Sequence, residues 1–153
     1  MSGEIATNRK ALHEYHILER FEAGIALKGT EVKSIRGGLA NLHHAFARIE
    51  NGEVYLHQAD IQPYEKASHE QHEPRRPRKL LLHRQEILKL SARTAIKGCT
   101  LPVLRMYWKG GRVKVEIGVG KGKAAPDKRQ DLKARQSQRE ADREVARFNK
   151  RRS

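Results

Sequence analysis

The residues best suited to covalent or metal chemistry in this sequence are eight histidines and one cysteine, Cys99. A zinc site needs Cys, His or carboxylate ligands at short regular spacings, and an active thiol needs a nearby base or cation. Neither arrangement is recognisable, and there is no phosphate-binding loop, HExxH or GxSxG motif. The sequence therefore predicts no catalytic residue, metal or cofactor, and we interpret as surface residues the close histidine pairs His13 with His16, His43 with His44 and His69 with His72.

Basic residues are far more numerous, and they are clustered. There are 32 Lys and Arg against 18 Asp and Glu, giving a net charge of +14. A field of this sign attracts polyanions, of which nucleic acid is the usual one for a chain of this size. Aromatic residues are few, so recognition of the shape and phosphates of a folded RNA is favoured over a single-strand stacking platform. The clusters are residues 75–79, Asn8-Arg9-Lys10, and Lys121, Lys123, Lys128 and Arg129.

The cysteine count and the length of the apolar runs indicate the cellular compartment. A single cysteine allows no internal disulfide, which is typical of a reducing environment. Residues 1–15 contain no apolar run of signal-peptide length, and the longest aliphatic run, residues 80–82, is far too short to cross a membrane. We therefore expect a cytoplasmic protein without a membrane partner.

The elements that must position these basic residues are mainly strands. Residues 15–27 alternate apolar and polar side chains, with Glu19 as the exception on the apolar side. Asn51-Gly52 and Gly110-Gly111 each separate two alternating runs, which predicts two hairpins. Helices are predicted from Thr30 as N-cap to Gly37 as C-terminal glycine, and from about residue 80 to 90. This pattern favours a mainly β fold, either an antiparallel barrel of the oligonucleotide-binding (OB) type with two short flanking helices or an open α+β sheet.

Three segments are expected along the chain: a disordered N-terminus over residues 1–8, a barrel domain over 9–123 and a basic tail over 124–153. In the tail, arginines recur at every fourth position, which would align them as one slowly winding ridge on a helix. Like charges at this spacing repel each other, so we expect the tail to be disordered alone and helical against RNA phosphates. The alternative is a solvated charged tail without a specific role.

Several short motifs occur in an order and spacing that resemble the tmRNA-binding small protein B (SmpB) family. They are Asn8-Arg9-Lys10-Ala11, residues 21–25 (FEAGI), residues 29–34 (GTEVKS) with Arg36, Gly38 and Asn41, residues 78–82 (RKLLL) with Glu86-Ile87, residues 120–123 (GKGK), and Asp127-Lys128-Arg129. The resemblance covers about residues 8–150. It implies an OB-type barrel that binds the tRNA-like domain of tmRNA and performs no covalent chemistry.

The resemblance also implies partners and residue roles. The partners are tmRNA, the small-subunit decoding centre and messenger channel of a stalled ribosome and, indirectly, elongation factor Tu in the delivery complex. Glu31 and Lys33 have the alternative role of holding a short helix to the barrel. The implied RNA-binding residues are Asn8, Arg9, Lys10, Glu22, Glu31, Lys33, Asn41, Arg78, Lys79, Leu81, Lys121 and Lys123, and the implied ribosome-contacting tail residues are Asp127, Lys128, Arg129, Arg135, Arg139, Arg143, Arg147 and Arg151.

Two positions depart from the family pattern. Pro126 stands where a histidine or aromatic residue is common, and Ala124 stands where a second lysine is usual. Proline cannot stack as an aromatic ring does, so no base-stacking role is assigned to that position. The rival interpretations are a structural ribosomal or general RNA-binding protein of similar charge, which would not prefer tmRNA over elongator tRNA, and an enzyme such as an RNA-modifying or nuclease protein, for which the sequence offers no acid–base or metal constellation.

Overall fold

The computed structural model describes residues 3–63 and 72–123. The chain divides into two units, residues 1–122 and 123–153, and all elements below belong to the first. In chain order they are β1 (Gly3–Thr7), α1 (Arg9–Glu14), β2 (Tyr15–Ile25), α2 (Gly29–Arg36), β3 (Ala40–Asn41), β4 (Phe46–Glu50), β5 (Glu53–His57), β6 (Asp60–Ile61), β7 (Arg78–Leu81), α3 (Arg84–Thr94), β8 (Cys99–Thr100), β9 (Val103–Lys109) and β10 (Arg112–Gly122).

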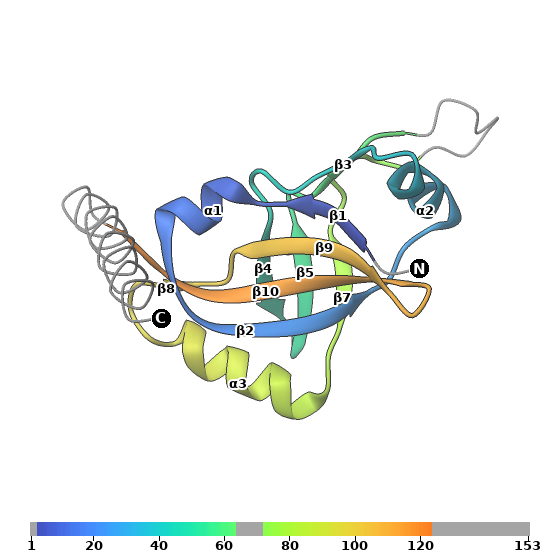
Figure 1. Ribbon diagram of the computed structural model, residues 1–153. Coiled ribbons are helices and arrows are strands. Elements are labelled where there is room, and N and C mark those ends of the chain that lie inside the picture. The colour runs from blue at the N-terminus through green and yellow to red at the C-terminus, as the bar shows by residue number, and fades with distance from the viewer. Residues whose placement is uncertain (1–2, 64–71, 124–153) are drawn as a thin grey trace, which may run out of the picture. The chain divides into compact units, whose positions relative to one another are not determined.

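The strands form an antiparallel sheet that closes on itself (Figure 1). Its order is β1-β9-β10-β2-β7-β5-β4, with β8 paired to β10 and a separate β3–β6 pair. At the far edge, β4 returns to the start of β9, where Phe46 bridges Pro102. The Ala47 N–H donates to the Leu101 carbonyl at 2.7 Å, and the Val103 N–H donates to the Ala45 carbonyl at 3.1 Å. These contacts make the sheet a barrel of the predicted OB type.

Both predicted hairpins are present, and their turns have the backbone that the sequence requires. Asn51 and Gly52 have φ values of 51° and 76°, and Gly110 and Gly111 have 59° and 76°. Positive φ at both central residues is the signature of the hairpin turn that matches strand twist. The first turn joins β4 to β5, and the second joins β9 to β10.

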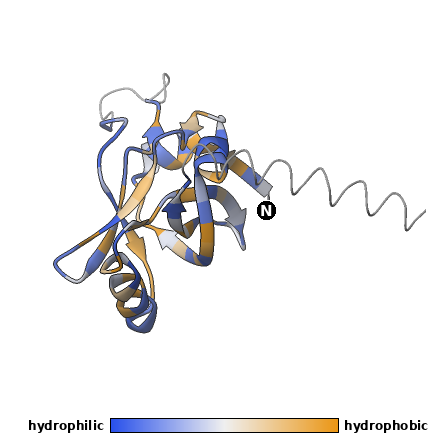
Figure 2. Ribbon diagram, turned by 90° about the vertical axis from the view of Figure 1, so that its left-hand side faces the viewer, coloured by the Kyte–Doolittle hydropathy of each residue, from blue (hydrophilic) through white to orange (hydrophobic). Residues whose placement is uncertain are grey.

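The core lies inside the barrel and is built by alternating strand residues. In β10, Val113, Val115, Ile117 and Val119 are all buried. In β2 the predicted parity holds, with odd-numbered residues turned inward, and Glu19 is accommodated because its carboxylate accepts from Arg93 Nε of α3 at 2.6 Å. Figure 2 shows hydrophobic residues concentrated along the strands and hydrophilic residues at the turns.

Three expectations about which segments form strands and helices are wrong. Residues 3–7 are not disordered, because they form β1 and pair with β9. Residues 80–81 belong to strand β7 rather than to a helix, and α3 begins only at Arg84. The described residues contain three helices rather than two, since α1 follows Asn8.

The boundaries of α2 also differ from the expectation. Lys28 rather than Thr30 is its N-cap, and the Lys28 N–H donates to Glu31 Oε1 at 2.8 Å. The residue with positive φ after the helix is Gly38, at 77°, because Gly37 has an ordinary φ of −81°.

None of the helices in the described part of the chain is long and apolar enough to span a bilayer.

Candidate nucleic-acid interface

Three of the predicted RNA-binding residues meet around one open hollow on the outside of the barrel. Pairing of β2 with β7 sets Gly24 opposite Leu81, which brings Glu22 of β2 beside Lys79 and Leu81 of β7. We call this the Glu22 hollow. Its described lining is Glu22, Gly24, Glu53, Lys79, Leu80, Leu81, Leu82, His83, Glu86 and Lys114.

Glu22 is exposed, and its carboxylate is held in place by two side chains of β9. The Tyr107 hydroxyl donates to Oε2 at 2.5 Å, and Lys109 Nζ lies 3.2 Å from both carboxylate oxygens. The Tyr107 hydrogen bond lowers the pKa of Glu22 below its ordinary value, with a smaller contribution from Lys109, and it outweighs burial, which acts in the opposite direction. Burial and the same hydrogen bond raise the pKa of the Tyr107 hydroxyl, so it remains a donor. Glu22 is therefore a fixed, ionised acceptor.

The charges around the hollow limit what it can bind. Glu22, Glu53 and Glu86 supply three carboxylates, and Lys79 already lies 3.7 Å from Glu53. The carboxylates outnumber the two lysines of the lining, Lys79 and Lys114, by one, so hydroxyl and amino groups that donate to a carboxylate are favoured here over phosphate. Leu81 is 53% exposed at its edge and offers an apolar contact. The hollow can thus recognise ribose hydroxyls or base amino groups.

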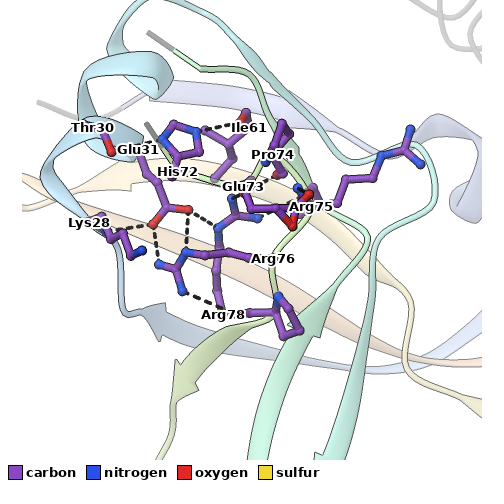
Figure 3. Close-up of polar contacts among 12 residues, drawn as sticks. Lys28, Thr30, Glu31, Ile61, His72, Glu73, Pro74, Arg75, Arg76 and Arg78 are labelled. Atoms are coloured by element: carbon purple, nitrogen blue, oxygen red, sulfur yellow. Dashed lines mark hydrogen bonds and ion pairs between the residues drawn. The ribbon is translucent and has the colours of Figure 1, made fainter. Parts of the chain in front are cut away.

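Two other predicted RNA-binding residues, Glu31 and Arg78, are wholly buried, and Figure 3 shows the polar contacts that surround them. The Glu31 carboxylate accepts from Arg78 Nε, from both Arg76 Nε and Nη2, and from the Lys28 N–H. Arg78 donates further to the carbonyls of Ala59 at 2.9 Å and Pro74 at 3.0 Å. The structure therefore does not expose Arg78 to RNA, since its guanidinium is buried and donates to groups inside the fold.

This network ties α2 to the segment that leads into β7. Burial alone would raise the pKa of Glu31, but the hydrogen bonds from Arg76, Lys28 and Arg78 lower it below the ordinary value. His72 joins the same region, and it is buried rather than on the surface as expected: its ring contacts Thr30 Oγ1 at 3.0 Å and the Ile61 carbonyl at 2.7 Å. The network sets the position from which Lys79 and Leu81 face outward.

Asn8 is also structural in this conformation. It is 2% exposed, and it caps α1 by accepting from the Ala11 N–H at 3.1 Å. Its Nδ2 donates to the Val103 carbonyl at 2.9 Å. Asn8 therefore fixes α1, which presents Arg9 to solvent and leaves Lys10 half-buried.

The remaining predicted residues are not gathered at the Glu22 hollow. Lys33 lies exposed on α2, Asn41 lies exposed on β3, where its Oδ1 accepts from the His43 N–H at 2.7 Å, and Lys121 lies exposed on β10. Lys123 is half-buried. Outside the described residues lie the predicted tail residues Asp127, Lys128, Arg129, Arg135, Arg139, Arg143, Arg147 and Arg151, together with Ala124 and Pro126.

Sequence reasoning missed Tyr107, Lys109 and Lys114 at this surface, although the signal was present. Within the predicted hairpin, Lys114 pairs with Tyr107 and Lys109 with Arg112. Once Val113 and Val115 are assigned inward, Lys114 must face outward beside Tyr107. The missing step was the pairing of β10 with β2, which sets Glu116 opposite Glu22 and is not encoded locally.

Among the residues that the structure describes, no cluster of His, Cys, Asp or Glu could hold a metal ion. Cys99 is a free thiol of intermediate exposure.

Known proteins share this sequence and fold. The family model described as SmpB protein matches residues 5–147. SsrA-binding proteins of Carboxydothermus hydrogenoformans and Desulforudis audaxviator are 56% and 54% identical over 140 and 143 residues, covering 92% and 94% of this chain and 94% and 91% of the relatives. A chain from the solved structure "tmRNA-SmpB: a journey to the center of the bacterial ribosome" is 48% identical, with a TM-score of 0.67 over 82% of this chain and 92% of that chain. On this evidence the chain belongs to the SmpB protein family.

Proposed function

We propose that this protein is an RNA-binding adaptor of trans-translation, which binds the tRNA-like domain of tmRNA and delivers it to stalled ribosomes. The carrying observation is the Glu22 hollow, a built recognition surface on a strongly basic chain of the SmpB family. The identity of the RNA is inferred from the relatives, which are named SsrA-binding proteins, and from the solved structure, whose title names tmRNA-SmpB and the bacterial ribosome.

The hollow and the net charge contribute differently to binding. A charge of +14 attracts any RNA and provides most of the affinity, which depends on salt because counterions are released. Selectivity requires contacts that a wrong RNA cannot make. A fixed carboxylate beside an exposed leucine suits a splayed nucleotide of a folded RNA, with donors from its ribose or base and an apolar face against Leu81.

The rest of the role extends this proposal. The basic tail, residues 124–153, occupies the decoding site and the empty messenger channel, and its arginines pair with ribosomal RNA phosphates. Elongation factor Tu joins the delivery complex through the RNA. The protein acts in the cytoplasm and performs no covalent chemistry.

The test is binding to the tRNA-like domain of tmRNA in the presence of excess elongator tRNA, across a range of salt concentrations. We expect Glu22→Gln to weaken selective binding by about 10- to 100-fold, as for the loss of a charge-assisted hydrogen bond. Tyr107→Phe frees the carboxylate and should give a smaller loss. Glu50→Gln is the matched control, because it removes the same charge outside the hollow.

The outcome separates the two RNA-binding interpretations. Removing a negative charge helps a general polyanion binder, so such a protein would bind both RNAs equally and gain slightly from either glutamine substitution. That result would overturn the proposed function.

A further inference from the structure

A second hollow adjoins the Glu22 hollow and differs from it in charge. It has a volume of about 460 Å³, and it lies where the end of α2 meets the β9–β10 turn. It shares Gly24, Leu81 and Lys114 with the Glu22 hollow. We call it the Trp108 hollow. Its other described lining residues are Ile25, Leu27, Val32, Arg36, Trp108, Gly111, Arg112 and Val113.

The Trp108 hollow combines an apolar floor with a cationic rim. Arg36, Arg112 and Lys114 supply three positive charges, and none of its described lining residues is Asp or Glu. No ion pair among the described residues involves any of these three cations. Most other arginines of the barrel face are paired; Arg20 and Arg105, for example, both pair with Glu116. The rim is thus available to an external anion.

The contrast between the hollows dictates where an RNA strand can place its phosphates. The Glu22 hollow has three carboxylates against Lys79 and the shared Lys114, whereas the Trp108 hollow has Arg36, Arg112 and the shared Lys114 and no carboxylate among its described lining residues. When the ribose or base of a nucleotide donates to Glu22, the favourable position for a neighbouring phosphate is therefore in the Trp108 hollow. Gly24 lies where the two hollows meet, and Leu81 and Lys114 pack close over it, since a Cβ there would lie 3.3 Å from Leu81 Cβ and 3.6 Å from Lys114 Nζ.

Trp108 supplies a surface that can receive a base. It is half-buried at the end of β9, on the same inward parity as Met106, so its ring is held by the barrel. Arg36 Cζ lies 5.9 Å from the ring centroid. Indole rings and guanidinium planes are the groups on which unpaired bases stack.

We infer that the Trp108 hollow binds one unpaired nucleotide of the RNA that contacts Glu22, with its base against Trp108 and Arg36 and its phosphate paired with Arg112 and Lys114. This inference rests on the proposed function and specifies its ligand: a nucleotide extruded from a folded RNA. Trp108 thus provides a local stacking site in a protein that otherwise offers few exposed aromatic rings.

The experiment uses the full chain, in which Trp108 is the sole tryptophan and reports on this hollow directly. The tRNA-like domain of tmRNA is titrated in, and binding is followed both by anisotropy of labelled RNA and by Trp108 fluorescence. We expect saturable fluorescence quenching at the same midpoint as the anisotropy change. Arg36→Gln and Arg112→Gln should each lower the magnitude of the salt slope by about 1, and Trp108→Leu should weaken binding roughly fivefold or more.

The control and the outcomes keep this inference separate from the proposed function. Arg48→Gln removes an equal charge from β4, outside both hollows, and should leave the quenching unchanged. The inference is overturned, and the proposed function left standing, by the following result: anisotropy shows selective binding, Trp108 fluorescence does not change, and Arg36→Gln and Arg112→Gln keep the wild-type salt slope. Absence of selective binding by wild-type protein would overturn both.

Discussion

Replacing Glu31 by glutamine separates a structural role for this carboxylate from the RNA contact that its sequence motif suggested. In the fold, Glu31 is fully buried and receives hydrogen bonds from Lys28, Arg76 and Arg78. Glutamine keeps one acceptor oxygen but turns an amide donor toward a guanidinium group, where two donors face each other. Arg78 would remain buried without its counterion.

The expected loss of stability is large. Breaking a buried ion pair by removing one partner costs about 3–5 kcal/mol, because the remaining charge stays buried. Domains of this size have total stabilities of about 5–15 kcal/mol. The substitution should therefore lower the midpoint of thermal unfolding by roughly 10 to 20 °C.

Urea unfolding followed by far-UV circular dichroism measures this loss. Glu19→Gln is the matched control, because Glu19 also accepts from an arginine, at 2.6 Å, but the two side chains are 37% and 38% exposed. A surface pair of this kind contributes about 1 kcal/mol or less. The stability difference between the two variants isolates the effect of burial.

The dependence on pH gives a second signature of the same pair. The pKa of folded Glu31 lies below its ordinary value of 4.5. Its contribution to stability is therefore complete above about pH 4.5 and is lost as the pH falls through the folded pKa. Glu31→Gln should flatten this acid-side decline. A variant as stable as wild type that nevertheless lost RNA binding would refute the reasoning and make Glu31 a direct RNA contact.

Three further predictions concern other parts of the chain. Gly118→Ala should destabilise the barrel by about 1–3 kcal/mol in urea unfolding, because the added Cβ would lie 2.9 Å from Leu104 Cδ1. Gly122→Ala on the same strand is the control and should be neutral, because a Cβ there meets nothing within 4 Å. Asn8→Ala removes the cap of α1 and a bond to Val103, and should cost about 1–2 kcal/mol in the same assay. A chain ending at Ala125 should bind tmRNA normally but fail in a peptide-tagging assay, and normal tagging would contradict the proposed role of the tail.

The strands and hairpins could be predicted because their signals are local. Alternation in β2 and β10 follows from one buried face, and Asn51-Gly52 and Gly110-Gly111 are residues that tolerate positive φ. The error at Leu80-Leu81 has a physical reason as well. Four residues cannot distinguish a short strand from the start of a helix, and β7 is extended because it pairs with β2 and β5.

The site was predictable only in part. The motifs at residues 21–25 and 78–82 identified three residues of the hollow, Glu22, Lys79 and Leu81, but the strand pairing that unites them with Lys114 is long-range. β1 was missed for a similar reason, since its five residues gain their structure from β9. Local sequence cannot supply such partners.

Burial of charge was the least visible property of all. Arg76 and Arg78 belong to the densest basic cluster, and composition counts them as RNA-binding charge, yet both pair with the Glu31 carboxylate inside the fold. Arg36 and Arg112 stand apart from any cluster in the sequence but line a hollow without a carboxylate among its described residues. Only cations that exchange a counterion for an RNA phosphate contribute to the salt dependence of binding. The net charge of +14 therefore overstates the number of phosphate contacts at residues 75–79 and gives no sign of those at Arg36 and Arg112. Measured salt slopes should therefore respond to Arg36 and Arg112, whereas changes at Arg78 should act through stability.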